Sequence, residues 1–136
     1  MKPAVLYHVT KTTTAARIKK LGILTGRRSN WVKAGSGERY GKRGEIFAFE
    51  HLSDAARWAS RMDWDFHTDI GSGKISIVEF LSTPKDWTVD DSDPLSQAGK
   101  LGRWLKSTKS IPPNQIVSVR VAARDFLLEK RKDWMP

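Results

Sequence analysis

The sequence predicts a single compact domain of the α+β or mixed α/β class. Its 136 residues suit one hydrophobic core. Short β-favouring runs alternate with segments of helical periodicity, and the sequence contains no internal repeat and no low-complexity segment. A chain of this size buries most of its apolar surface without covalent cross-links. We therefore expect residues 1–136 to form one domain that ends in a charged tail at residues 124–136.

The composition excludes several classes of site and indicates a compartment. Without cysteine, the chain has no disulfide framework, no thiolate nucleophile and no cysteine zinc site, which fits a reducing environment. The N-terminal residues, "MKPAVLYH", begin no long apolar stretch. We expect a soluble, cytoplasmic protein that does not act on a membrane.

The N-terminal half predicts a strand and a helix, followed by a long loop. The apolar run at residues 4–9 predicts the strand. Thr12, Thr13 and Thr14 offer N-cap hydroxyls to a helix that Gly22 terminates. A loop rich in Gly, Ser, Arg and Lys follows at residues 25–44, and ordered loops of this length are often functional.

The remainder alternates strands and helices. Ser53 is predicted to cap the helix "DAARWASRM", and residues 95–106 allow a helix weakened by Gly99 and Gly102. The predicted strands are residues 45–50, residues 74–81 with a near-continuous apolar core typical of a covered strand, and residues 115–122. A polar link at residues 63–73, an acidic turn at 86–94 and a proline turn at 111–114 separate them.

The positive charge is concentrated in one segment. The chain has a net charge of +9, and residues 11–43 hold ten Lys or Arg against one acid, Glu38, so this segment carries the whole excess. A localised positive field attracts nucleic acid, phosphates or an acidic protein surface. A basic, well-solvated face without a specific partner is the alternative.

The usual catalytic motifs are absent. The sequence has no phosphate-binding loop of the P-loop type, and "GSGERYG" at residues 35–41 fits a flexible loop. The three histidines lack metal-ligand spacing, so we expect no metal site. A nuclease with paired histidines would require His8 to meet His51 or His67 in space.

The order of several short motifs carries more information. "LYHVTKTTTAARIKKLGIL", "GEIFAFEHLSDAARWA", "KISIVEFLSTPKDWTVDDSD" and "SIPPNQIVSVRV" follow one another along residues 4–122. In this order they resemble the small branches of the ADP-ribosyltransferase superfamily: tRNA 2′-phosphotransferases, rifamycin-modifying transferases and DNA-modifying toxins. The resemblance implies an α+β domain with split mixed β-sheets and short helices around a cleft that clamps NAD.

The resemblance also implies roles for individual residues. His8 would hydrogen-bond a ribose hydroxyl of NAD, supported by the Thr10 hydroxyl, since an imidazole donates and accepts at neutral pH. The family's stacking aromatic falls on Phe47 or Phe49, with Tyr40 just upstream, because the strand lacks the usual tyrosine. Trp58 fits the core better than a stacking platform.

The group that would stabilise the oxocarbenium-like centre is left open by the sequence. Asp90 or Asp91, in the acidic turn with Asp93, rank first, because the rifamycin-modifying branch keeps its acid there. Gln115, at the start of the last strand, ranks second, and Glu79 ranks third. The acidic turn is also compatible with a purely solvated role.

The basic loop predicts a phosphate or nucleic-acid site. In the resembling tRNA 2′-phosphotransferases, basic residues in this region contact phosphates of RNA and NAD, and arginine suits bidentate phosphate contact. Interleaved aromatic residues suit base stacking. The residues concerned are Arg27, Arg28, Trp31, Arg39, Lys42 and Arg43.

Three functions follow from these observations. The favoured one is transfer of ADP-ribose from NAD to a nucleic acid or protein acceptor, with His8, Asp90, Asp91 and Gln115 as catalytic candidates. The second is a non-catalytic basic protein that occupies nucleic acid or inhibits a ribonucleoprotein, as mobile-element accessory or anti-defence proteins do. The third is a small ribonuclease toxin that uses His8 with an Arg or Lys.

Overall fold

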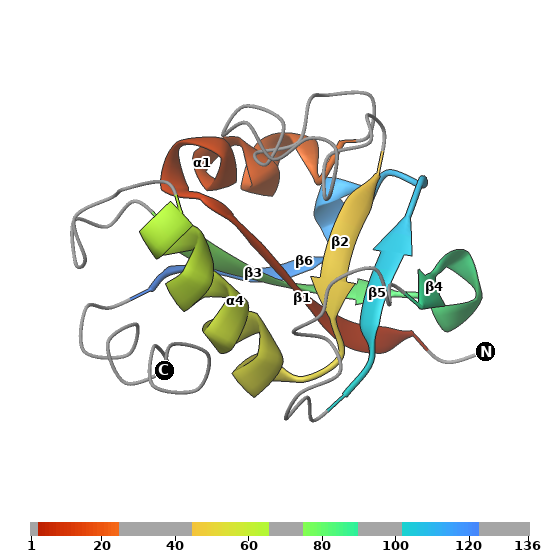
Figure 1. Cartoon of the computed structure of the whole chain (residues 1–136). Helices are drawn as coiled ribbons and strands as arrows, with labels where there is room; N and C mark the ends of the chain where they lie inside the picture. The colour runs from red at the N-terminus through yellow and green to blue at the C-terminus, as the bar shows by residue number, and fades with distance from the viewer. Residues whose placement is uncertain (1–2, 25–44, 66–74, 90–101, 123–136) are drawn as a thin grey trace.

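The computed structural model contains one small α+β domain (Figure 1). It describes residues 3–24, 45–65, 75–89 and 102–122, with the backbone alone for residues 61–65. The described strands are β1 (Ala4–Lys11), β2 (Ile46–Phe49), β3 (Ile75–Ser82), β4 (Thr88–Val89), β5 (Trp104–Ser107) and β6 (Ile116–Val121). The helices are α1 (Thr12–Leu21) and α4 (Leu52–Asp65), with short 3-10 turns η1 (Pro84–Asp86) and η3 (Pro113–Gln115).

The six strands form one sheet in the order β4-β5-β2-β1-β3-β6. Every pairing between described strands is antiparallel, so the expectation of mixed sheets is wrong for this part of the chain. The near-continuous apolar sequence of β3 does correspond to a central strand covered on both faces, as predicted. Its position explains the composition, because alternate side chains of β3 enter different hydrophobic clusters.

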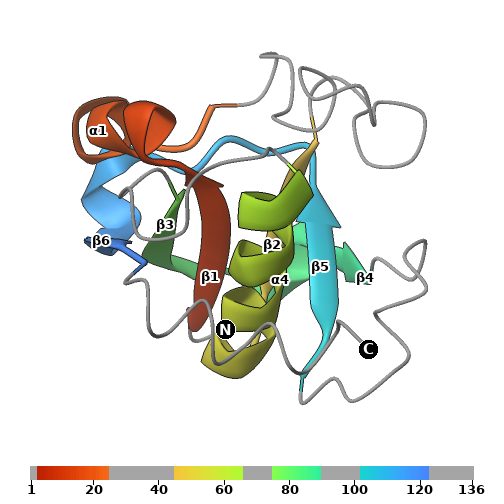
Figure 2. The same cartoon turned by 60° about the vertical axis from the view of Figure 1, so that its left-hand side comes forward.

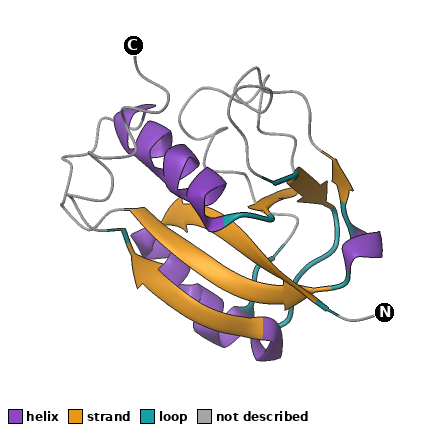
Figure 3. Cartoon of the chain, turned by 90° about the horizontal axis from the view of Figure 1, so that it is seen from below, coloured by secondary structure: helices purple, strands orange, loops and turns teal. Residues whose placement is uncertain are grey.

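The two helices cover opposite faces of the long strands (Figure 3). On one face, Trp58 and two alanines of α4 pack with Val9 and Ile77. On the other face, Ile18 of α1 joins a second cluster with side chains from β1, β3, β2 and β5. The sheet is thus the shared middle layer between two cores, which explains why β1 carries buried residues of both alternating sets.

Both helix starts differ from the sequence prediction. Lys11 occupies the N-cap of α1 without a side-chain cap, and the Thr12 hydroxyl instead hydrogen-bonds Ser76 Oγ of β3 at 2.8 Å. At α4, the Ser53 N–H donates to the His51 ring Nδ1 at 3.1 Å, so His51 and not Ser53 supplies the cap. In both cases a neighbouring group satisfies the terminal N–H or hydroxyl, which local sequence preference does not reveal.

The C-terminal half also corrects two predictions. The helix expected at residues 95–106 is wrong at its end, because Trp104–Ser107 is β5 and pairs with β2 and β4. The 3-10 turn η1 ends at Asp86, where the acidic turn begins, and the short strand β4 lies within that turn; the sequence pattern missed both. The last strand is confirmed from Ile116, whereas Gln115 belongs to η3 before it.

Gly22 fixes the end of α1. Its φ of 76° lies in the left-handed region, and a Cβ there would stand 2.0 Å from the Ile111 carbonyl oxygen. The next residue, Ile23, exchanges two backbone hydrogen bonds with Ile111, at 2.8 and 2.9 Å. The chain after α1 is thereby tied to the segment before β6. No helix in the described ranges is long and apolar enough to cross a membrane.

Replacing Gly22 tests this close approach. We expect Gly22→Ala to lower the free energy of unfolding by at least about 2 kcal/mol, from the positive φ and the clash with Ile111. Ala16→Gly, at an exposed position of the same helix, should cost only about 1 kcal/mol. Urea denaturation measures both variants, and equal losses would contradict a specific role for Gly22.

Candidate functional site

The sheet is divided into two halves between β1 and β2. β1 pairs with β3 along its whole length, and β2 pairs with β5 along its whole length. Between β1 and β2, only Tyr7 and Phe49 are in register. Ladder pairing therefore joins the halves β4-β5-β2 and β1-β3-β6 at one residue pair and stops beyond it, although β1 and β2 remain neighbours. Figure 2 shows the two halves on either side of α4.

The His8 ring spans this split. Its Nδ1 lies 2.7 Å from the carbonyl oxygen of Phe47. In a continuous ladder, a backbone N–H of β1 would satisfy such a carbonyl. Because a carbonyl oxygen can only accept, Nδ1 must carry the proton. The hydrogen bond therefore fixes both the orientation of the ring and its tautomer.

The same environment keeps the ring neutral. His8 retains part of its surface exposed, yet protein atoms surround it closely enough that burial lowers its pKa below the ordinary value of 6.5. The hydrogen bond to Phe47 opposes this shift and is the smaller effect. At neutral pH, Nε2 then carries a lone pair, and no described residue hydrogen-bonds to it. His8 thus presents a hydrogen-bond acceptor of fixed direction.

Thr10 supports this part of β1 from within the protein. It is completely buried and, two residues after His8, lies on the same face of the strand. Its partner in β3 is Ser76, the residue that the Thr12 hydroxyl binds. Full burial suits a supporting role better than direct contact with a ligand.

The aromatic candidates differ in exposure. Phe49 is 3% exposed, and its ring packs against Trp58 at a centroid distance of 6.2 Å and against Trp104 at 5.1 Å. A ring so enclosed offers no free face for stacking in this structure. Trp58 is buried in the same cluster, as expected of a core residue. Phe47 is half-buried, and its carbonyl already serves His8.

The described acid and amide candidates do not converge on His8. Glu79 pairs with Tyr7, whereas His8 pairs with Val78, so Glu79 and His8 lie on opposite faces of the half β1-β3-β6. The Glu79 carboxylate instead accepts a hydrogen bond from Ser118 at 3.2 Å. Gln115 precedes the edge strand β6, two strands from β1, which is about 10 Å across the sheet. The His8 ring points the other way, towards β2.

The remaining predicted site residues lie outside the described part of the chain. They are Arg27, Arg28, Trp31, Arg39, Tyr40, Lys42, Arg43, Asp90 and Asp91. The pairing of His8 with His67 falls there too, and His51 serves as the cap of α4. Among the described residues, no group of three His, Asp or Glu side chains is placed to hold a metal ion.

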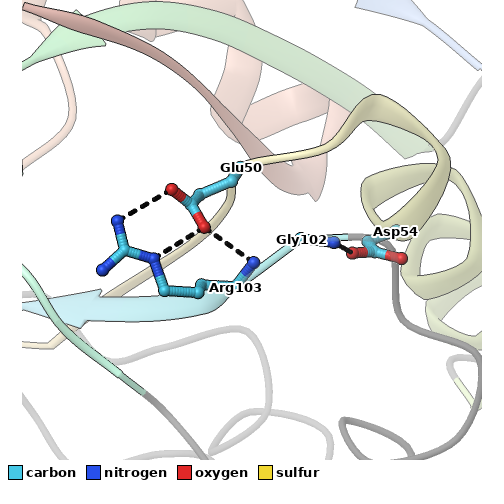
Figure 4. A network of polar contacts seen from close by, with 4 residues as sticks. All are labelled: Glu50, Asp54, Gly102 and Arg103. Carbon is cyan, nitrogen blue, oxygen red and sulfur yellow. Dashed lines mark hydrogen bonds and ion pairs between the residues drawn. The ribbon is translucent and has the colours of Figure 1, made fainter.

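Two carboxylates missed by the sequence analysis hold the start of β5 (Figure 4). Glu50 accepts from the Arg103 backbone N–H at 2.7 Å and from the guanidinium at 2.8 and 2.9 Å. Asp54, fully buried in the first turn of α4, accepts from the Gly102 N–H at 2.9 Å. The sequence spacing of Glu50 and Asp54 did not indicate this role, because the residues that they bind lie about fifty residues away in sequence.

This carboxylate clamp, Glu50 and Asp54 with residues 102–103, fixes the half β4-β5-β2 relative to α4. Since α4 also packs against β1 and β3, the clamp helps to keep the split in shape. Comparison of the chain with protein-family models and with curated proteins gave no match. The arrangement of residues is therefore the evidence on function.

The clamp predicts an acid-sensitive contribution to stability. The side-chain hydrogen bond from Arg103 holds the pKa of Glu50 below its usual value of 4.5, helped by the backbone hydrogen bond and the charge of Arg103. A lowered pKa means that the contribution is present above about pH 4.5 and disappears as the pH falls through the folded-state value. Because the pair is substantially exposed, we expect only about 0.5–1 kcal/mol between wild type and Glu50→Gln at pH 7.

Chemical denaturation at several pH values measures this difference. The difference in the free energy of unfolding between wild type and Glu50→Gln should shrink as the pH falls below 4.5. When Arg103→Gln is present in both proteins, the same comparison should show no difference. A difference that does not depend on pH would show that Glu50 acts through packing rather than charge.

Proposed function

We propose that the protein is a NAD-dependent ADP-ribosyltransferase whose dinucleotide site is the split between β1 and β2. The observation that carries the proposal is His8, held across the split by Phe47 with its Nε2 directed away as an acceptor. The motif order along residues 4–122 implies a split sheet that clamps NAD, and the end of ladder pairing between β1 and β2 after Tyr7 and Phe49 supports that expectation.

The protonation state of His8 defines the contact that it would make. A neutral ring with Nδ1 protonated accepts at Nε2, so its partner must be a donor such as a ribose hydroxyl. Within the split, His8 would orient the ribose rather than transfer protons. Thr10 would act behind it, by holding β1 in place against β3.

The acid that stabilises the departing nicotinamide must come from elsewhere in the chain. Glu79 faces the opposite side of the sheet from His8, which argues against its third-ranked role. Gln115 lies two strands away. Asp90 and Asp91 follow β4, which is three strands from β1 in the sheet, but they lie outside the described residues. We keep them as the first-ranked candidates for the electrostatic stabilisation of positive charge at the ribose.

A second candidate is a binding protein without catalysis, acting on nucleic acid or a ribonucleoprotein. It is favoured by one observation: among the described residues, no carboxylate shares a site with His8. Such a protein would bind NAD or a related nucleotide, or only the polyanion, and would release no nicotinamide. The ribonuclease alternative requires cleavage of RNA in the absence of NAD.

Thermal unfolding with and without NAD tests the proposed site. A ligand that binds only the native state stabilises it by about 2.7 kcal/mol at 100 times its Kd. We expect NAD to raise the Tm of the wild type by several degrees. In His8→Asn, the side-chain amide can still donate to the Phe47 carbonyl but offers no acceptor at the position of Nε2. This variant should remain folded and lose the NAD-dependent shift.

His51→Asn is the matched control, because an asparagine can still accept the Ser53 N–H at the cap of α4. Its response to NAD should equal that of the wild type. Absence of a shift in the wild type, or an unchanged shift in His8→Asn, would overturn the proposed site. A shift without release of nicotinamide would select the binding protein, and RNA cleavage without NAD would select the ribonuclease.

The lowered pKa of His8 gives the pH dependence of NAD binding. A protonated ring cannot accept at Nε2, so binding should weaken only when His8 becomes charged. Because burial lowers the pKa of His8 below its ordinary value of 6.5, we expect the affinity for NAD, followed between about pH 8 and pH 5, to fall by half only at a pH below 6.5. Titration calorimetry across this range measures it, and loss of affinity above pH 6.5 would contradict a neutral, buried His8.

A further inference from the structure

Two segments that contain no acidic residue lie side by side in the structure. Residues 1–37 contain no Asp or Glu, and neither do residues 94–124. The fold joins their described parts, because Ile23 and Ile111 exchange backbone hydrogen bonds and α1 packs against η3 and β6. Figure 2 shows α1 beside the blue segment that leads into β6. We call the exposed side chains of α1 and of residues 108–114 the acid-free face.

The contribution of α1 is cationic and open to solvent. Ala15 and Ile18 point into the core, which leaves Arg17, Lys19 and Lys20 exposed. Thr13 and Ala16 are the small exposed residues beside them, and the larger Leu21, four residues after Arg17, is exposed as well. Arg17 and Lys20 are three residues apart and therefore neighbours on the helix surface.

The second segment extends this surface with polar groups. Thr108, Lys109 and Asn114 are all exposed. Lys109 lies 3.4 Å from Asp86, but its side chain is 69% exposed, so this ion pair is weak and easily exchanged. The described face thus combines Lys and Arg with hydroxyl and amide groups, the side chains that most often contact phosphate and sugar.

We propose that the acid-free face binds the sugar-phosphate backbone of a nucleic acid. Charge complementarity carries the choice of partner, because four exposed cations on this face stand against no acid of its own. The face also lacks exposed aromatic residues, which are the usual anchors of protein–protein interfaces. Three of its four cations lie on one helix, α1, and the fourth, Lys109, lies in the second segment.

The inference deepens the proposed function, because it names nucleic acid as the class of acceptor. It rests on the proposed function only in treating the bound nucleic acid as an acceptor of ADP-ribose. ADP-ribose transfer to a nucleic acid requires the acceptor to be held on the same molecule as NAD. Binding to the acid-free face requires no NAD. The two proposals can therefore fail separately.

Fluorescence anisotropy with labelled oligonucleotides of ~20 nucleotides, single-stranded RNA, single-stranded DNA and duplex DNA, tests the inference without NAD. We expect binding at roughly 50 mM salt that weakens steeply towards roughly 200 mM, because counterions are released from the phosphates. Arg17→Glu and Lys20→Glu should each weaken binding roughly three- to tenfold and reduce the logarithmic salt slope by about one.

Lys85→Glu is the matched control. Lys85 is exposed in η1, which leads into the edge strand β4, whereas α1 packs against β6 at the other edge of the sheet (Figure 1). Its neighbour Asp86 pairs with Lys109, so Lys85→Glu is the control for the cations of α1 and not for Lys109. Lys85→Glu changes the net charge as much as Lys20→Glu does. Its affinity for the oligonucleotides should stay within about twofold of that of the wild type. Far-ultraviolet circular dichroism and the Tm of each variant confirm that it folds.

Three results would overturn the inference. The first is the absence of binding to any of the oligonucleotides at low salt. The second is equal weakening by Lys20→Glu and Lys85→Glu, which would indicate attraction by net charge alone. The third is competition by poly-L-glutamate as effective as that of unlabelled oligonucleotide, which would indicate an acidic protein surface. The NAD-dependent Tm shift is unaffected by each of these outcomes.

Discussion

The hydrogen bond from the His8 ring to the Phe47 carbonyl is the interaction on which the proposed site depends. It lies where the backbone ladder between β1 and β2 stops after the pair Tyr7 and Phe49. Without a side-chain donor, this part-buried carbonyl would lose its partner, and leaving it unsatisfied costs at most the roughly 1–3 kcal/mol of a fully buried group. One residue therefore stabilises the split through Nδ1, and its other ring nitrogen, Nε2, is the atom that the proposed function assigns to the ligand. The structural and functional explanations of His8 are compatible because they use different ring nitrogens.

Side chains rather than backbone pairing hold the two halves together around this bond. The aromatic rings of Phe49, Trp58 and Trp104 meet at 5.1 to 6.2 Å and link β2, β5 and α4, while Val9 and Ile77 join the same cluster from the other half. Pairs of this kind each contribute about 0.5–1.5 kcal/mol beyond the area they bury. Side-chain packing against α4 holds β1 and β2 together where the backbone ladder between them has stopped. The hydrophobic core under α4 therefore makes the split possible.

The sequence predicted what depends on local pattern. Alternation and apolar runs located β1, β2, β3 and β6, and helical periodicity located α1 and α4. The sequence did not predict features set by distant partners: the Thr12 hydroxyl bound to Ser76, the cap by His51, and the pairing of Trp104–Ser107 with β2. Gly99 and Gly102 were interpreted as weak points of a helix. In the structure, Gly102 is close to Glu50 and its N–H binds Asp54, contacts that no local rule contains.

The same distinction applies to the candidate site. His8 was recognisable from the motif order along residues 4–122, but its tautomer and neutral state follow only from Phe47 and the surrounding atoms. Strand register then separates the candidates: one residue of offset in β3 puts Val78 opposite His8 and turns Glu79 to the other face. An acid that acts with His8 must therefore reach the face occupied by α1 and Ile18. A strand carboxylate at an even offset from Val78 would meet this condition, but Ser76, Phe80 and Ser82 occupy those positions. A carboxylate that acts with His8 therefore does not come from β3 and must be supplied by another part of the chain.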